Sequence, residues 1–105
     1  MINREIQLER MITDILISFD FEGVHNLMKK IKWSWVSTDG VPSIIELKEM
    51  AVKLLREAIE NGEKNKDYYE VATGGLVAEY FYNEGELRLS FVIDRDSSFL
   101  NQRIK

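Results

Sequence analysis

One stretch of the sequence combines aromatic and basic side chains in a pattern that could bind a ligand. Residues 29–35 read Lys-Lys-Ile-Lys-Trp-Ser-Trp. If this stretch is extended, Trp33 and Trp35 point to the same side and could stack on a nucleotide base. The ammonium groups of Lys30 and Lys32 could then contact its phosphates. The alternative is that both tryptophans lie in the core, and it is favoured because large aromatic side chains dominate protein cores.

A second candidate is Thr73-Gly74-Gly75, which lies between two strand-like runs. Consecutive backbone amides near glycines can form a concave site that binds an anion. No helix is expected after these glycines, so the segment is not a phosphate loop of the usual kind. A tight turn or a bulge is the favoured interpretation.

Carboxylates within and at the end of the predicted strands could in principle hold a metal ion for a hydrolase or nuclease, although a solvated strand terminus is the favoured interpretation of Asp94 and Asp96. Glu79, Asp94 and Asp96 are the candidates. The chain has no cysteine and a single histidine, His25, which is fewer ligands than zinc usually takes. No Gly-x-Ser-x-Gly or Ser-x-x-Lys motif is present. We therefore assign no catalytic residue, no metal ligand and no cofactor, and an enzyme is the less favoured class.

Helices are expected to occupy the first part of the chain. Apolar residues at helical spacing predict a helix over 3–18 and another that starts at Asp20, whose carboxylate caps its first turn. Ser43 and Glu46 form a capping box, which predicts a third helix over 44–61. Gly62 is a natural stop for that helix.

The apolar period falls from 3.6 to 2 after Gly62. Residues 63–67 are expected to be a solvated connector, and residues 68–73, 76–82 and 86–94 read as strands. Residues 33–36 are a further strand candidate. The order predicts an α+β fold in which two to three N-terminal helices pack on one face of a small antiparallel sheet of three to four strands. The other sheet face is left to water or a partner.

Composition limits the class of protein. The chain has 105 residues, which is the size of one domain, and residues 1–105 are expected to form it, with a frayed tail from about 96. A net charge of −4 disfavours a binder of bulk nucleic acid. The absence of cysteine, of a signal peptide and of a membrane anchor favours the cytoplasm.

Several runs together resemble a group of small uncharacterised bacteriophage and prophage proteins. The similarity spans residues 19–93 and rests on these runs: Phe19-Asp20-Phe21-Glu22, Trp33-Ser34-Trp35, Gly40-Val41-Pro42-Ser43-Ile44 with Glu46-Leu47, Ala72-Thr73-Gly74-Gly75 and Leu87-Arg88-Leu89-Ser90-Phe91-Val92. The resemblance brings no activity and no functional residues. It implies a phage protein that acts in the bacterial cytoplasm.

The leading hypothesis is a non-enzymatic, phage-type binding protein with an anti-defence role. It would either block a host or defence protein or sequester a nucleotide signal. Free sheet edges and tyrosines 68, 69, 80 and 82 make a homodimer or a higher homo-oligomer plausible, unless these tyrosines pack on the helices. A structural or virion assembly component and a small metal-dependent hydrolase or nuclease are the alternatives.

Overall fold

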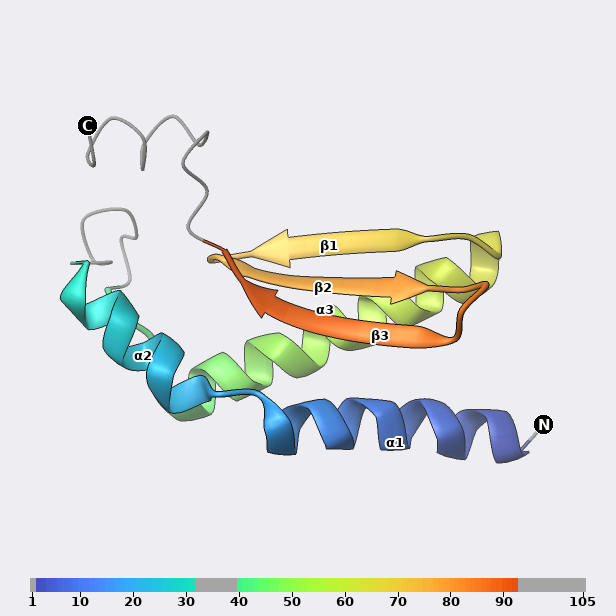
Figure 1. Ribbon diagram of the computed structural model, residues 1–105, viewed down its shortest axis with the longest axis horizontal. Coiled ribbons are helices and arrows are strands. Elements are labelled where there is room, and N and C mark those ends of the chain that lie inside the picture. Colours follow the sequence, from blue (N-terminus) through green and yellow to red (C-terminus); the bar gives the residue numbers. More distant parts are fainter. Residues whose placement is uncertain (1, 32–39, 93–105) are drawn as a thin grey trace.

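The computed structural model describes residues 2–31 and 40–92. Within them, three helices precede a three-stranded antiparallel sheet in the order β1-β2-β3 (Figure 1). The elements are α1 (Ile2–Ser18), α2 (Phe21–Lys30), α3 (Ile44–Asn65), β1 (Tyr69–Thr73), β2 (Leu76–Phe81) and β3 (Glu86–Phe91). This confirms the predicted α+β fold. The strand candidate over 33–36 and the tail from residue 96 lie outside the described residues.

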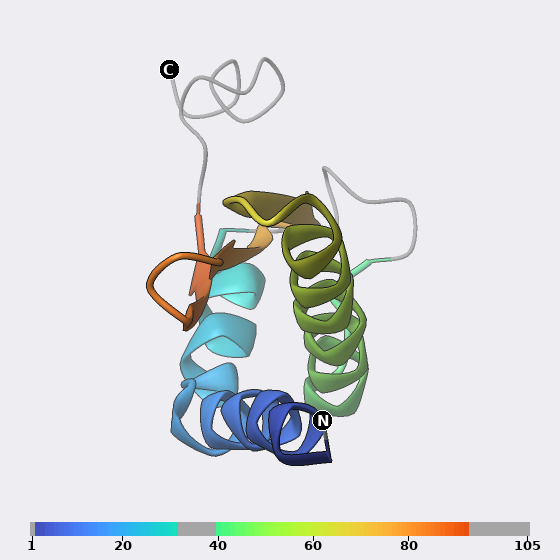
Figure 2. The ribbon, with the colours of Figure 1, turned by 90° about the vertical axis from the view of Figure 1, so that its right-hand side faces the viewer.

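The helices gather on one face of the sheet. α3 packs mainly against β1 and β2, α1 packs against α3 and β3, and α2 packs against α3. Figure 2 looks along the long axis and shows α1 below, with α3 and β3 rising on either side of it. Within the described part of the chain, the opposite face of the sheet is covered by no helix (Figures 1 and 2).

The core lies between α3 and the sheet. On β2, Leu76, Ala78 and Tyr80 are fully buried, whereas the residues between them are only partly buried. This alternation follows from the two-residue period of a strand, which places successive side chains on opposite faces. α3 contributes a fully buried stripe to the same core: Leu47, Ala51, Leu55 and Ala58. A single apolar core therefore joins the helices to the sheet.

Both predicted helix caps are confirmed. The backbone N–H of Gly23 donates to Asp20 Oδ1 at 2.9 Å, so Asp20 caps α2. Ser43 and Glu46 form the complete capping box of α3. The Glu46 N–H donates to Ser43 Oγ at 3.1 Å, and the Ser43 N–H donates to Glu46 Oε1 at 2.8 Å. Each cap satisfies amides that the first helical turn leaves without a partner.

The predicted stop at Gly62 is wrong. α3 continues to Asn65 and ends at Lys66, which adopts the left-handed conformation at φ 55°. Gly62 is buried inside the helix, and a Cβ built on it would lie 2.3 Å from Cδ2 of Tyr80. Glycine is therefore needed here for the close approach of the Tyr80 ring rather than to end the helix. The solvated connector predicted over 63–67 is correspondingly shorter.

Strand boundaries differ slightly from the prediction. β1 begins at Tyr69 rather than at residue 68, and β2 ends at Phe81 because Tyr82 belongs to the turn that leads to β3. β3 ends at Phe91, and the predicted strand residues 93 and 94 lie outside the described part. Residues 82–85 form the turn between β2 and β3, with Gly85 at φ 65°.

We expect Gly62→Ala to lower the free energy of unfolding by about 1–3 kcal/mol, the usual cost of overpacking. Alanine is the better helix former, so helix propensity alone predicts the opposite sign. Urea denaturation measures the effect. The exposed Lys64→Ala in the same helix serves as the control and should change stability by no more than about 0.5 kcal/mol. A Gly62→Ala variant as stable as the wild type would contradict the packing role of Gly62.

Candidate functional site on the outer face of the sheet

The residues predicted to bind a ligand are only partly described. Lys32, Trp33 and Trp35 lie outside the described residues, so their role stays a prediction. Lys30 is exposed in the last turn of α2. The turn that follows β1 begins after Thr73, and Figure 1 shows this turn at the same end of the molecule as the end of α2.

Thr73, Gly74 and Gly75 form the connection between β1 and β2. Thr73 pairs with Leu76, and the two glycines between them have φ of 56° and 91°. Positive φ at both central residues is what a two-residue hairpin turn of type I′ requires. The Gly75 carbonyl accepts a hydrogen bond from the Val92 N–H at 2.8 Å, which ties the turn to the end of β3. The predicted tight turn is confirmed, and anion binding by the turn stays a prediction.

The candidate metal ligands do not form a cluster in the described part of the chain. Asp94 and Asp96 lie outside it, and the Glu79 carboxylate accepts a hydrogen bond from Tyr68 at 2.8 Å. No group of three or more His, Cys, Asp or Glu side chains suited to a metal ion occurs within residues 2–31 and 40–92. His25 Nδ1 lies 2.9 Å from the Pro42 carbonyl oxygen. Because a carbonyl only accepts, this ring nitrogen donates and links α2 to the segment before α3.

Two surface hollows on the described helices are small. A hollow of about 170 Å³ between α1 and α3 has Leu8, Ile12 and Ile59 among its lining residues, with Arg56 beside it. Arg56 forms an ion pair there with Glu9, in which Nη2 donates to Oε1 at 3.1 Å. Another hollow, of about 270 Å³, lies on α2 beside Lys30. Both volumes fall below the roughly 300–1,000 Å³ typical of small-molecule sites.

The outer face of the sheet offers a broader surface. We use the name outer face for the side chains that point away from α3, as the strand alternation and pairing place them: Glu70, Ala72, Val77, Glu79, Phe81, Glu86, Arg88 and Ser90, with Tyr68 at the edge. Tyr68 is 43% exposed. The opposite side of the same strands is anchored in the core, so this surface is held by rigid backbone.

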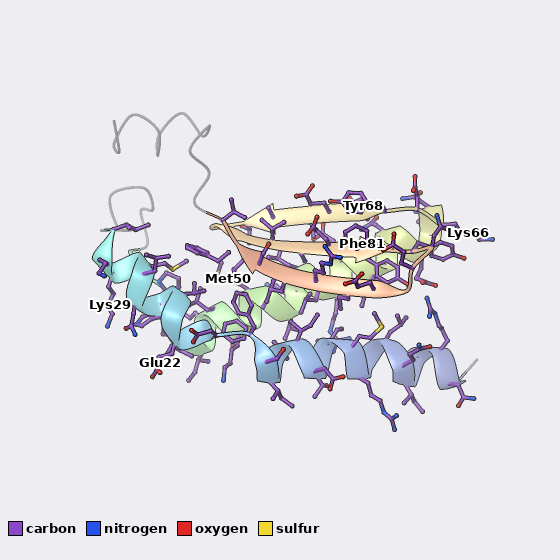
Figure 3. All side chains as sticks on the ribbon, in the orientation of Figure 1. Glu22, Lys29, Met50, Lys66, Tyr68 and Phe81 are labelled. Atoms are coloured by element: carbon purple, nitrogen blue, oxygen red, sulfur yellow. The ribbon has the colours of Figure 1, made fainter. Side chains whose placement is uncertain are left out.

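Three side chains form a row across the outer face. The Tyr68 and Phe81 ring centroids lie 5.0 Å apart with the ring planes at 48° (Figure 3). On the other side of Phe81, the guanidinium carbon of Arg88 lies 4.8 Å from the ring centroid. Arg88 Nε also donates to Glu86 Oε2 at 2.9 Å. The row therefore combines an aromatic pair with a cation–π contact.

Two carboxylates face each other beside this row. Glu70 of β1 is directly opposite Glu79 of β2. The Tyr68 hydroxyl oxygen lies 2.8 Å from Glu79 Oε2 and 3.2 Å from Glu70 Oε1. Desolvation and the hydrogen bond to Glu79 raise the pKa of Tyr68 well above its usual range. The hydroxyl therefore keeps its proton, and it donates its single hydrogen to one of the two carboxylates at a time.

A part-buried polar cluster lies at the other side of the sheet, where α1, α3 and β2 meet. The Tyr80 hydroxyl donates to the Glu63 carboxylate, and Arg4 Nη2 donates to both Glu63 and the Tyr80 oxygen, the latter at 2.6 Å. Burial and the hydrogen bond to Glu63 raise the pKa of Tyr80 to about 12. Burial opposes ionisation of Glu63, but hydrogen bonds from Tyr80 and Arg4 outweigh it and lower the pKa of Glu63. None of these shifts brings a group towards neutral pH, so the cluster joins the elements rather than transferring protons.

Sequence reasoning did not single out the row on the outer face. The alternation in residues 76–82 already places Val77, Glu79 and Phe81 on one side of β2. What the sequence lacked was the strand register, which brings Arg88 next to Glu79 and Phe81. Of the four tyrosines considered for a homodimer, Tyr80 is fully buried and contributes nothing to a surface.

Comparison with family models, with characterised proteins and with solved structures gives no match. The resemblance to small phage proteins is therefore neither supported nor contradicted. Within the described residues, no helix is long and apolar enough to cross a membrane.

The Glu63 cluster predicts a specific pH dependence. A carboxyl group whose pKa is lowered by folding stabilises the protein above its unfolded pKa of about 4.3, and this contribution is lost as the pH falls through the folded value. We expect Glu63→Gln to cost about 1 kcal/mol at pH 7, since the cluster is partly exposed, and to reduce the loss of stability between about pH 5 and pH 3.

Urea denaturation at a series of pH values measures this dependence. Glu57→Gln, an exposed residue of the same helix, should keep the wild-type pH profile. If Glu63→Gln and Glu57→Gln have the same profile, the cluster does not stabilise the fold.

Proposed function

We propose that the protein is a non-enzymatic binding protein that uses its outer face to occupy the surface of a partner protein. The observation that carries the proposal is the Tyr68, Phe81 and Arg88 row, which lies on a sheet face that no described helix covers. Tyrosine and arginine are the residue types that dominate the binding energy of protein interfaces. A row already held in place loses little side-chain freedom when it binds.

The proposed setting is that of a phage protein in the bacterial cytoplasm, where the partner is a host or defence protein. The resemblance over residues 19–93 supports this setting. Blocking a partner requires only a stable surface and no reaction, which is consistent with a face built on three paired strands. No cofactor is proposed.

Sequestering a nucleotide signal is the less favoured version of the same proposal. It depends on Lys32, Trp33 and Trp35, which are outside the described residues. On the outer face, the carboxylates of Glu70 and Glu79 would repel a phosphate group. No described contact favours a virion assembly role or a metal-dependent hydrolase over binding.

Retention of a partner should depend on the outer face. We expect tagged wild-type protein in bacterial cells to retain at least one host or defence protein. Phe81→Ser and Arg88→Ala should reduce that retention at least tenfold, because they remove the centre and one end of the row. Quantitative mass spectrometry of the purified complexes measures the retention.

Ile17→Ser is the matched control because Ile17 is 78% exposed on α1, away from the sheet. It should leave retention unchanged. Circular dichroism and thermal melting confirm that each variant is folded. Equal retention by the wild type and Phe81→Ser, or loss with Ile17→Ser alone, would place the binding surface elsewhere.

The two versions of the proposal differ in their response to small ligands. A ligand that binds only the folded state raises the Tm by mass action. If the protein blocks a partner protein and binds no nucleotide, a panel of cyclic and linear nucleotides should leave the Tm unchanged. A nucleotide that raises the Tm, with the rise abolished by Trp33→Ala or Trp35→Ala, would favour the sequestering version instead.

A further inference from the structure

We infer that the segment of the partner that docks on the outer face is cationic, a stretch of protein that presents Lys or Arg side chains to Glu70 and Glu79. This inference rests on the proposed function and names the chemistry of the partner. Its basis is the arrangement of charged groups and aromatic rings on the outer face.

Charge on the outer face is unbalanced. The described side chains on it include Glu70, Glu79 and Glu86 against Arg88. Arg88 lies opposite Glu79 in the strand pairing, but its guanidinium forms an ion pair with Glu86 at 2.9 Å and rests on Phe81. Glu86 is thereby paired. The charge of Arg88 also attracts Glu79, but neither Glu70 nor Glu79 forms an ion pair among the described residues.

The two carboxylates are also close neighbours. Like charges placed directly opposite each other on adjacent strands are destabilising. The Tyr68 hydroxyl has one hydrogen to donate, at 2.8 Å to Glu79 or 3.2 Å to Glu70, so it satisfies one carboxylate at a time. An ammonium or a guanidinium placed between them would donate to both and remove the repulsion.

The surroundings suit the rest of a basic side chain. The stems of Lys and Arg are apolar and lie along apolar surface while the charged group remains at its edge. Val77 and Phe81 lie on the same strand as Glu79 and are partly buried, so they provide such a surface. The contact of Arg88 with the Phe81 ring, at 4.8 Å, shows the geometry that a guanidinium adopts on this face.

A second copy of the chain fits this face less well. In a two-fold symmetric dimer the same surface is present on both sides of the interface. On both copies the outer face carries more carboxylates than cations, Glu70, Glu79 and Glu86 against Arg88, so bringing the two faces together adds repulsion. A cationic segment of another protein brings the complementary charge instead.

Nuclear magnetic resonance of the full-length chain tests this inference. The probes are three synthetic ten-residue peptides that are identical except for four positions, which hold Arg, Gln or Glu. We expect the Arg peptide to shift the amide signals of β1 and β2 at residues 70, 77, 79 and 81. The double variant Glu70→Gln with Glu79→Gln should weaken that binding at least tenfold.

The matched control removes the same charge elsewhere. Glu49→Gln with Glu57→Gln changes two exposed carboxylates of α3 and should alter the affinity for the Arg peptide less than twofold. If both double variants weaken binding equally, the peptide responds to net charge alone and the inference fails.

Other outcomes are equally decisive. If the Gln or Glu peptide shifts the outer-face signals and the Arg peptide does not, the face binds a partner of different chemistry and the proposed function stands without this inference. If dilution of the free protein shifts the same signals, a second copy occupies the face and the inference is overturned. Absence of any shift with the Arg peptide also overturns it, whereas the proposed function is judged separately by retention of a cellular partner.

Discussion

The contact between Tyr80 and Gly62 sets the geometry of the molecule. Tyr80 belongs to the central strand, is fully buried and lies against the backbone of α3 where Gly62 has no side chain. Its hydroxyl reaches Glu63 and Arg4, so one side chain joins α1, α3 and β2. A larger residue at position 62 would displace the strand from the helix. Because this side of the sheet is fixed to the helices, the side chains on the other side are not needed to join the sheet to the core.

Much of the architecture could be predicted from local pattern. The capping box at Ser43 and the cap at Asp20 are decided by residues three positions apart, and a single sequence displays such signals directly. The change of apolar period near residue 68 likewise marks where helices give way to strands. Gly62 misled the prediction because glycine commonly ends helices, and only the position of Tyr80, 18 residues later, explains why it lies within one.

The candidate site was harder to predict than the architecture, because it depends on contacts between residues that are distant in the sequence. Alternation in β2 indicates that Phe81 and Glu79 share a face, but it does not say which residues of β1 and β3 stand beside them. That information resides in the register, which pairs Glu79 with Glu70 on one side and with Arg88 on the other. Trp33 and Trp35, by contrast, were candidates for ligand binding because of their residue type and spacing alone, and they lie outside the described residues.

Alternate residues of β2 have different environments, one set in the core and the other on the outer face. The core contains Leu76, Ala78 and Tyr80, which stabilise the fold. The outer face contains Val77, Glu79 and Phe81. Substitutions at the second set leave the core untouched, so the chemistry of the proposed binding face can diverge between lineages without a matching change in architecture. If partner and protein are under mutual selection, sequence variation should concentrate at the odd-numbered positions of this strand, with the even-numbered ones held constant by packing.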